Sequence, residues 1–443
     1  IQALLERGKF EKLKKKYTYE KGNLTSEQEI KIEYLYDKYD RQIGEAKENL
    51  SRETKYEYEN HRLKKMVNPL GQETTYNYDK AGNLTNVLKP GKGEKKIEHQ
   101  YKYDDLNRIE QEIDPIGIVT QRVYDEIGNI KNITQTSKNE RKRITEYGHD
   151  NEGNITRVKD AVGNEIQRTY NASNLLETEC YLVEGKQIDA TRYDRFLDGR
   201  LHSVKNVDDS KDQIHYDDYM GNVERTITKG VTSAAIHYKK SNRIERLYYE
   251  SSESRTSYSY DAVGNIKEIT DGNESKTSYD YDHLNKVKTR KNPLGEIEKF
   301  ERDSAGRLLR KTSPSGKAIT YDYDKLDRLV SKSYGSNKEP DVSIEYDDNA
   351  NKRIMKDWTG TSTYEYDEFG RIESVISSDG NRIKYEYDDF GNLAKLIYPD
   401  GKCVSYEYDD LDQLKSVRDR NGEVTLYTRD HKGNIIKIER KQN

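Results

Sequence analysis

A tyrosine–aspartate pair that recurs at a regular interval is the feature that most limits how this chain can fold. The pairs repeat about every 22 residues, and in nearly every unit the third residue after the aspartate is glycine, asparagine or aspartate. Such self-similarity is typical of proteins that stack one supersecondary unit many times. The clearest copies are Tyr78, Asp79 and Gly82; Tyr103, Asp104 and Asn107; Tyr124, Asp125 and Gly128; Tyr260, Asp261 and Gly264; Tyr281, Asp282 and Asn285; Tyr366, Asp367 and Gly370; and Tyr387, Asp388 and Gly391.

Each unit reads Tyr-x-Tyr-Asp-x-x-Gly, as in the segment from Tyr76 to Gly82. Alternate side chains of a strand lie on one face, so the two tyrosine rings share a face. The aspartate can accept a hydrogen bond from a backbone N–H two or three residues further on, which starts a turn. The third residue after it is expected in the left-handed region, as in a type I turn that ends in a glycine bulge. The pattern therefore predicts a hairpin at each pair, except where Gly199 falls two residues late after Asp194.

A second turn signal follows each hairpin. Leu, Ile or Val begins a return strand after the first turn, and a Pro-x-Gly or Asn-Gly turn then follows in many units, as at Pro69 to Gly71. This meander gives roughly 34 strands, which would make a flat sheet about 160 Å wide. Because strands twist and edges need protection, we expect the sheet to coil.

The expected fold class is all-β, with tandem antiparallel β-hairpin repeats that form a spiralling single-layer β-shell. The shell is expected over residues 17–443, with the clearest repeats in 76–440. Residues 1–16 form a short N-terminal segment whose sequence allows a helix. The chain reads as a fragment of a longer protein.

Composition indicates that this sheet is wet on both faces. Charged residues make up 36% of the chain and hydrophobic ones 32%, which alone would suggest disorder. However, the chain has 37 Tyr against 5 Phe and 1 Trp. Tyrosine suits a surface that is half packed and half hydrated, because its ring is buried while its hydroxyl group finds a partner.

The sequence offers no catalytic, cofactor-binding or metal-binding residues. The Asp-x-x-Gly segments could be read as calcium loops, but the alternating acids and closing glutamate of an EF-hand are missing. The tyrosine ladders could stack on sugars, although packing within the wall explains them as well. The 8 histidines are scattered. Cys180 and Cys403 are read as inert thiols, or one of them as an edge thiol, in preference to a disulfide.

Charge and hydropathy limit the classes of partner that we expect for this chain. Lys and Arg total 77 against 81 Asp and Glu, and the two signs alternate along the chain, so we expect no binding of nucleic acid by the repeats. No apolar run approaches the length of about 20 residues that a membrane-spanning helix needs.

The segments YDKAGNL, YDDLNRI, YDAVGNI, YDEFGRI and YDDFGNL, with DPIG and NPLG turns between them, closely resemble the YD-repeat or Rhs-repeat family. The family includes bacterial Rhs proteins, wall-associated proteins, the C subunits of insecticidal toxin complexes and animal teneurins. The resemblance extends from about Tyr17 to Arg440 and implies a spiralling β-shell. In bacterial polymorphic toxins such a shell encloses a C-terminal toxin domain. The family's self-cleaving closing motif is not found before Asn443, so no cleavage residues are assigned.

Three functions follow from this resemblance and from the residues. The favoured one is a non-catalytic segment of a secreted or cell-wall-associated bacterial toxin shell, with a C-terminal toxin domain as cargo and secretion-system proteins as further partners. The alternative is a cell-surface adhesion or recognition module that binds glycans or a partner protein. An enzyme acting on cell-wall sugars is the third and is the least supported.

Overall fold

The computed structural model describes residues 9–20, 23–36, 42–47, 52–92, 95–206, 211–216, 223–228, 231–237, 243–249, 255–303, 305–335, 340–347 and 352–441. Within these residues it contains 39 strands of one sheet and no helix. Each strand pairs antiparallel with its neighbours in the sequence, from β1 with β2 to β38 with β39. The predicted all-β fold of consecutive antiparallel hairpins is confirmed.

The strands of the first half are β1 Lys9–Glu20, β2 Asn23–Tyr36, β3 Gln42–Lys47, β4 Arg52–Glu59, β5 Arg62–Val67, β6 Glu73–Tyr78, β7 Leu84–Pro90, β8 Lys96–Tyr103, β9 Ile109–Ile113, β10 Val119–Tyr124, β11 Ile130–Thr136, β12 Lys142–His149, β13 Ile155–Lys159, β14 Glu165–Tyr170, β15 Leu176–Val183, β16 Lys186–Arg195, β17 Leu201–Lys205, β18 Lys211–Tyr216, β19 Val223–Thr228 and β20 Val231–His237.

Those of the second half are β21 Ile244–Tyr249, β22 Arg255–Tyr260, β23 Ile266–Thr270, β24 Lys276–Tyr281, β25 Val287–Lys291, β26 Ile297–Arg302, β27 Leu308–Thr312, β28 Ala318–Tyr323, β29 Leu329–Ser333, β30 Val342–Tyr346, β31 Lys352–Asp357, β32 Gly360–Tyr366, β33 Ile372–Ile376, β34 Arg382–Tyr387, β35 Leu393–Ile397, β36 Cys403–Tyr408, β37 Leu414–Arg418, β38 Val424–Arg429 and β39 Ile435–Lys441.

The meander places its turns on two opposite edges of the sheet. Turns that follow even-numbered strands contain the tyrosine–aspartate motif or a degenerate copy of it, and we call this edge the YD rim. Its described turns begin at Asp79, Asp104, Asp125, Asp150, Asn171, Phe196, Asp261, Asp282, Asp303, Asp324, Asp367, Asp388, Asp409 and Asp430. Turns that follow odd-numbered strands form the return rim, with turns that begin at Asn68, Asp114, Ser137, Asp160, Asp271, Asn292, Ser313, Ser377, Tyr398 and Asp419.

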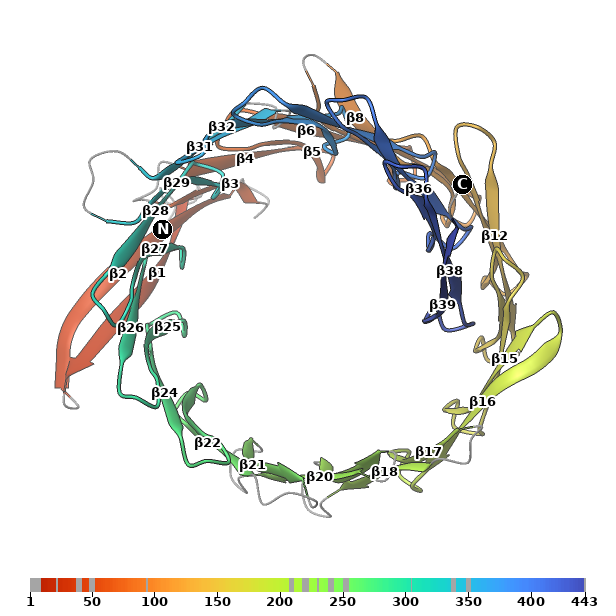
Figure 1. Ribbon diagram of the computed structural model, residues 1–443, viewed down its shortest axis with the longest axis horizontal. Coiled ribbons are helices and arrows are strands. Elements are labelled where there is room, and N and C mark those ends of the chain that lie inside the picture. Colours follow the sequence, from red (N-terminus) through yellow and green to blue (C-terminus); the bar gives the residue numbers. More distant parts are fainter. Residues whose placement is uncertain are drawn as a thin grey trace.

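The sheet curves into a coil that passes through more than one full circle (Figure 1). The strands from β32 onward, in blue, lie along the wall formed by β6 to β16, in orange and yellow. Ion pairs between residues as much as 281 positions apart join these two layers. We call the layer that contains β6–β16 the first coil, the layer that contains β32–β39 the second coil, and the contact between them the seam.

The wall has almost no sealed apolar interior. Among the described hydrophobic residues only Ile118 is buried, at 9% exposure, and the fully buried side chains are Ser203 and Ser374. Most strand residues are half-buried on both faces. A single layer with solvent on each side has this pattern, because no second sheet or helix covers either face.

The N-terminal segment differs from the expectation. Where a helix over 1–16 was allowed, residues from Lys9 onward form β1, which pairs with β2 from Lys9 opposite Leu35 to Glu20 opposite Asn23. Lysine, glutamate and leucine favour a helix, but intrinsic propensity is a small effect that tertiary context overrides, here through the ladder of pairs with β2. The helix is therefore wrong from Lys9, and the shell starts before residue 17. Residues 1–8 lie outside the described part.

Candidate functional site at the YD rim and the seam

Most described turns of the YD rim are held by the carboxylate of an aspartate; the turns at Asn171 and Phe196 are the exceptions. Oδ1 of Asp79 accepts hydrogen bonds from the backbone N–H groups of Gly82 (2.7 Å) and Asn83 (2.8 Å). The N–H of Gly82 also donates to the Asp79 carbonyl oxygen, 3.2 Å away, and Gly82 has a φ of +99°. The strand register shifts between Asn77 and Tyr78, as a bulge requires. The Asp79 carboxylate therefore accepts hydrogen bonds from the third and the fourth residue after it, whereas the sequence predicted a bond to the second or third.

The other motif residues singled out from the sequence take the same places. In each turn Oδ1 of the aspartate accepts the N–H of the fourth residue at 2.8 to 3.0 Å; the acceptors are Asp104, Asp125, Asp261, Asp282, Asp367 and Asp388. The third residue has a positive φ in every case: 60° at Asn107, 100° at Gly128, 103° at Gly264, 58° at Asn285, 83° at Gly370 and 89° at Gly391.

These hydrogen bonds stabilise the charged form of the carboxylates of Asp79 and Asp104. The backbone N–H of Asn83 is the main group that lowers the pKa of Asp79 below its usual value of 3.8. The backbone N–H of Arg108 does the same to the pKa of Asp104. Hydrogen bonds that favour the ionised form always have this effect. Asp79 and Asp104 thus stay charged to a lower pH than an ordinary aspartate.

The tyrosines of the motif tie each repeat to the one before it. The hydroxyl group of Tyr78 donates to the carbonyl oxygen of Leu63, 2.9 Å away, where the preceding return strand begins. The same bond, at 2.7 to 2.9 Å, joins Tyr103 to Leu84, Tyr124 to Ile109, Tyr260 to Ile244, Tyr281 to Ile266 and Tyr387 to Ile372. The described contact of Tyr366 is made by its backbone: the carbonyl oxygen accepts a hydrogen bond from Lys92 Nζ, 3.3 Å away.

The residue after the left-handed position, which the sequence did not single out, links neighbouring turns. Arg108 Nε donates to Asp104 Oδ2 at 2.7 Å, and its guanidinium carbon lies 4.2 Å from the ring centroid of Tyr124 in the next unit. Asn83 Nδ2 donates to Oδ1 of Asn107 at 2.7 Å. The signal was present in the sequence, because this position holds Asn or Arg in many units.

The unit that breaks the motif keeps the turn by shifting it. The N–H of Gly199 donates to the carbonyl oxygen of Phe196, which takes the place of the usual aspartate. Asp194 lies inside β16, and its Oδ2 accepts the hydroxyl of the fully buried Ser203 at 2.9 Å. The geometry of the turn is therefore maintained by the glycine even where the aspartate is displaced.

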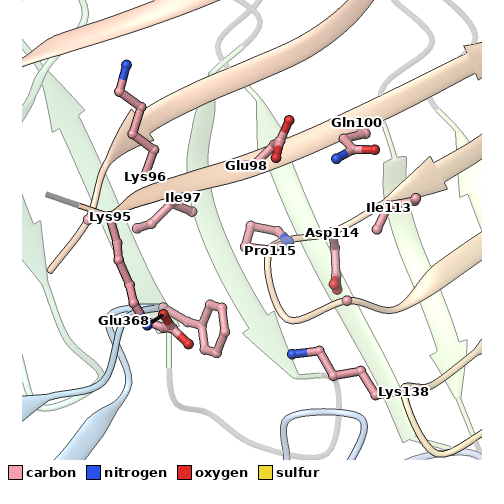
Figure 2. Close-up of a pocket in the computed structure, with 13 residues that line it drawn as sticks. Lys95, Lys96, Ile97, Glu98, Gln100, Ile113, Asp114, Pro115, Lys138 and Glu368 are labelled. Carbon is pink, nitrogen blue, oxygen red and sulfur yellow. Dashed lines mark hydrogen bonds and ion pairs between the residues drawn. The ribbon is translucent and has the colours of Figure 1, made fainter.

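The seam begins at the loop between β7 and β8, where two lysines reach across to the second coil. Lys95 Nζ lies 2.8 Å from a carboxylate oxygen of Glu368, and Lys92 Nζ lies 3.1 Å from one of Glu373 (the Lys95–Glu368 pair is drawn in Figure 2). Lys138 Nζ lies 5.6 Å from the centroid of Phe369. The second coil thus meets the first through cations of the return rim and through acidic and aromatic groups of the YD rim.

A groove of about 310 Å³ lies at this point of the seam. Figure 2 shows Glu98 and Gln100 of β8 beside the turn that contains Asp114 and Pro115, with Lys138 on the neighbouring turn between β11 and β12. Acidic, basic and apolar groups all line it. Across the described part of the chain, no group of three or more His, Cys, Asp or Glu residues could hold a metal ion.

An arginine pair forms the centre of the seam. Arg143 donates from both terminal nitrogens to the carboxylate of Asp412, at 2.7 Å each, and only 6% of its side chain is exposed. Its guanidinium carbon also lies 3.5 Å from the centroid of Phe390. Arg141 pairs with Asp410 at 2.5 Å. A bidentate pair of this kind fixes geometry as well as charge.

The last hairpin is attached to β15 and β16. His431 Nε2 lies 3.3 Å from Asp189 Oδ2, and Lys432 pairs with the same carboxylate. Although burial acts to raise it, these hydrogen bonds hold the pKa of Asp189 below its usual value. The Tyr181 ring packs against His431 with centroids 5.0 Å apart, and burial raises the pKa of Tyr181 to about 12.

Cys180 and Cys403 are both free and half-buried. None of the described residues belongs to a helix long and apolar enough to cross a membrane.

Comparison with known families gives two matches. A family model described as Teneurin YD-shell matches residues 111–300 and 338–443, more than half of the chain. A model described as RHS Repeat matches residues 56–94 and 302–338. No curated protein sequence matches the chain.

Solved structures show the same fold. The crystal structure of TcdB2-TccC3-Cdc42 has a TM-score of 0.68 at 15% identity, and that of TcdB2-TccC3-TEV has 0.67 at 15% identity; each match covers 97% of this chain and 26% of the other. The pore structure of the Photorhabdus luminescens Tc holotoxin, with a substituted TccC3, has a TM-score of 0.59 at 14% identity and covers 98% of this chain and 28% of the other. This chain thus spans about a quarter of each of these polypeptides.

Proposed function

Because this chain belongs to the Teneurin YD-shell family, we propose that it is a segment of a non-catalytic shell wall that encloses and protects a C-terminal toxin cargo. The protein would be secreted or held at the bacterial cell surface. The cargo, which is not in this chain, would be its main partner. The observation that carries the proposal is the seam, because it turns an open meander into a wall that closes upon itself.

The seam supports enclosure because it joins residues that are far apart in the sequence. The pairs Lys95–Glu368, Arg141–Asp410 and Asp189–His431 connect positions 273, 269 and 242 residues apart. A coil held at one edge only would unwind easily, since each hairpin contacts only its neighbours. Contacts between coils close the wall against this motion.

The polarity of the wall also fits the proposal. Both faces of the described strands are half-exposed and rich in charged and hydroxyl side chains. A polar lining does not drive a contained polypeptide to bury its apolar groups on the wall, since that attraction scales with the apolar area available. The wall can therefore contain a cargo without holding it permanently.

The test is limited trypsin digestion of the natural full-length protein that contains these residues. We expect the region after Asn443 to resist cleavage in the native protein and to be cut rapidly after Arg143→Glu, which breaks the centre of the seam. The control is Val162→Ser at an exposed return turn, which should leave the resistance unchanged. Cleavage of that region in the native protein at the rate of the isolated region would contradict enclosure.

A second candidate, recognition of surface glycans, is favoured by one observation. Trp358 lies at the tip of the turn between β31 and β32 and is 92% exposed. An exposed indole ring can pack against the apolar face of a sugar. Binding to a glycan array that is lost in Trp358→Ala and kept in Val162→Ser would support this role.

A further inference from the structure

The face of the wall that carries the motif tyrosines follows a pairing rule. In most repeats that have a tyrosine three residues before the turn, the residue opposite it on the return strand is apolar, and paired residues share a face. The described pairs of this kind are Tyr76 with Val87, Tyr147 with Val158, Tyr193 with Val204, Tyr258 with Ile269, Tyr364 with Val375, Tyr385 with Leu396, Tyr406 with Val417 and Tyr427 with Ile438. The rule places an aliphatic side chain beside each ring.

Three consecutive repeats, from β24 to β29, break this rule in the same way. In each of them a cation stands where the apolar residue is expected: Arg290 lies opposite Tyr279, Lys311 opposite Phe300 and Lys332 opposite Tyr321. Six strands in succession therefore carry an aromatic ring and a cation in turn on one face. We call these six residues the aromatic–cation stripe.

The stability of the wall does not explain the three cations. An aliphatic side chain beside a half-buried ring removes apolar surface from water, and a cation over a ring that water can reach returns less free energy than that. Lys311 Nζ lies 5.5 Å from the centroid of Phe300, and Lys332 Nζ lies 5.8 Å from that of Tyr321. Both distances are close to the outer limit of about 6 Å for such a contact. Departures from a chain's own structural rule are expected where a residue serves function.

The stripe also has too few acidic partners. Among the residues of β24–β29, the acidic side chain on this face is Glu298, which lies 3.6 Å from Arg290 and 3.0 Å from Lys311. Lys332 forms no ion pair with the residues that the structure describes, and its Nζ lies between the rings of Tyr321 and Tyr334. Three cations therefore share one carboxylate.

The cations can be reached from solvent. The side chains of Arg290 and Lys311 are 49% and 36% exposed. The other acidic residues of these strands, Asp280, Glu301 and Asp322, alternate with the rings and so lie on the opposite face. The stripe is thus a basic and aromatic surface with capacity for further carboxylates.

The spacing of the cations limits the ligand. They recur at every second strand, and each repeat is offset along the strands because Arg290 is paired with Glu298, two residues before Phe300. These two displacements give about 12 Å between successive cations. The phosphates of one nucleic-acid strand follow at about 3.4 Å, which would place several charges on each cation and others against Glu298. An extended polypeptide advances about 3.1 to 3.4 Å per residue, so a carboxylate at about every fourth residue matches the spacing.

We infer that the aromatic–cation stripe binds an extended acidic polypeptide in which acidic residues alternate with aromatic residues or proline. The ligand's carboxylates pair with Arg290, Lys311 and Lys332, and its intervening side chains pack on the three rings. Charge complementarity and spacing select this ligand. The inference goes beyond enclosure of a cargo, because it assigns a binding site to one stretch of the wall.

The probe is a fluorescein-labelled peptide of four Glu-Pro-Phe-Pro units, in which proline favours the extended form. It is titrated against the whole chain by fluorescence anisotropy. A second peptide has the same composition, but its four glutamates are contiguous at one end. We expect the spaced peptide to bind at least about fivefold more tightly than the block peptide, and its affinity to fall as salt is added.

The test variant restores the pairing rule with Arg290→Ile, Lys311→Val and Lys332→Leu together. It should bind the spaced peptide about tenfold or more weakly, while its denaturation midpoint should be no lower than that of the wild type. The matched control removes three positive charges from the opposite face of the same strands, with Lys291→Thr, Lys299→Thr and Arg310→Thr. It should leave the affinity unchanged.

Four results would overturn the inference. The first is no binding of the spaced peptide, or equal binding of the two peptides. The second is an equal loss of affinity in both triple variants, since net charge would then be the cause. The third is tighter binding of an oligothymidylate than of the peptide, and the fourth is self-association of the chain that the test variant abolishes. The trypsin test of enclosure does not involve these residues, so either proposal can fail alone.

Discussion

Arg143 and Asp412 lie 269 residues apart in the sequence, yet they form a bidentate ion pair with two hydrogen bonds of 2.7 Å. The arginine is 6% exposed, and the aspartate is 47% exposed. The return rim of the first coil contributes the arginine and the YD rim of the second coil contributes the aspartate. A single residue pair therefore reports on whether the coils are in contact.

Arg143→Glu is expected to loosen the seam. It places a carboxylate against Asp412 and removes the cation over Phe390. Because one partner of the pair remains solvent-accessible, the loss in free energy of unfolding should be about 2 kcal/mol. Hydrogen exchange should rise in β33–β39 before it rises elsewhere. The compensating double variant Arg143→Glu with Asp412→Arg should recover part of the loss.

The control for this prediction is Arg157→Glu. Arg157 pairs with Glu146 and Glu165 on the neighbouring strands of its own coil, so its loss removes ion pairs without touching the seam. Exchange in β33–β39 should stay at the wild-type rate. If both variants loosen the second coil equally, the effect comes from net charge and the seam assignment is wrong.

Tyr387→Phe should destabilise the wall while it leaves the packing of the ring intact. The change removes only the hydroxyl group that donates to the Ile372 carbonyl oxygen at 2.8 Å. The expected cost is about 1 kcal/mol, because an intramolecular hydrogen bond of a half-buried group is lost. Chemical denaturation measures it. Tyr334→Phe is the control, since Tyr334 is 51% exposed and should tolerate the change with no measurable loss.

The hairpins could be predicted from the sequence because each turn is specified by residues within the turn itself. Asp79, Gly82 and Asn83 lie within one turn, and the aspartate, glycine and asparagine each have an intrinsic preference for their position. The shift of the turn to Phe196 could be anticipated only in part. The sequence shows Gly199 out of step, but the burial of Ser203 against Asp194 depends on neighbouring strands.

The seam could not be predicted from the sequence. Its partners, such as Lys95 and Glu368, are ordinary residues in a chain rich in both charges, and nothing local marks them as a pair. Their meeting depends on how many strands complete one circle, and that number follows from the accumulated twist and bending of every hairpin. The part of β1 from Lys9 to Lys16 was missed for a related reason, because pairing with β2 outweighs the local preference of these residues.

Stability should fall as the pH drops below the range in which Asp79 and Asp104 are ionised. The pKa of Asp79 is lower in the folded chain than its usual 3.8, mainly through the Asn83 backbone N–H. A depressed carboxyl pKa contributes stability that is present above the unfolded value and is lost as the pH falls through the folded value. Thermal melts followed by circular dichroism should show a decline from about pH 5 downward.

A substitution already present in another repeat isolates this effect. Asn171 occupies the aspartate position of its own turn, and its Oδ1 accepts the N–H groups of Ser173 (2.9 Å) and Leu175 (3.1 Å). Asp79→Asn should therefore keep the backbone hydrogen bonds of the turn, while it loses the charge and the Oδ2 acceptor of Asn83 Nδ2. The wild type should be the more stable of the two at pH 7, and the difference should shrink as the pH falls through the lowered pKa of Asp79. A stability difference that stays constant over this range would contradict the assigned role of the Asp79 charge.

Gly370 gives the sharpest test of the turn geometry, because its surroundings are open. Its φ is +83°, and an added Cβ would meet no atom within 4 Å, so any cost of substitution comes from the backbone alone. Gly370→Ala should cost about 1 kcal/mol, and Gly370→Val should cost more, since β-branched residues tolerate this region least. Gly370→Asn should cost much less, because Asn107 and Asn285 occupy the same position with φ values of 60° and 58°.

Gly335, equally open but without a positive φ, is the matched control, and Gly335→Ala should be neutral or slightly stabilising. Equal effects of alanine and asparagine at Gly370 in chemical denaturation would show that the left-handed turn does not form.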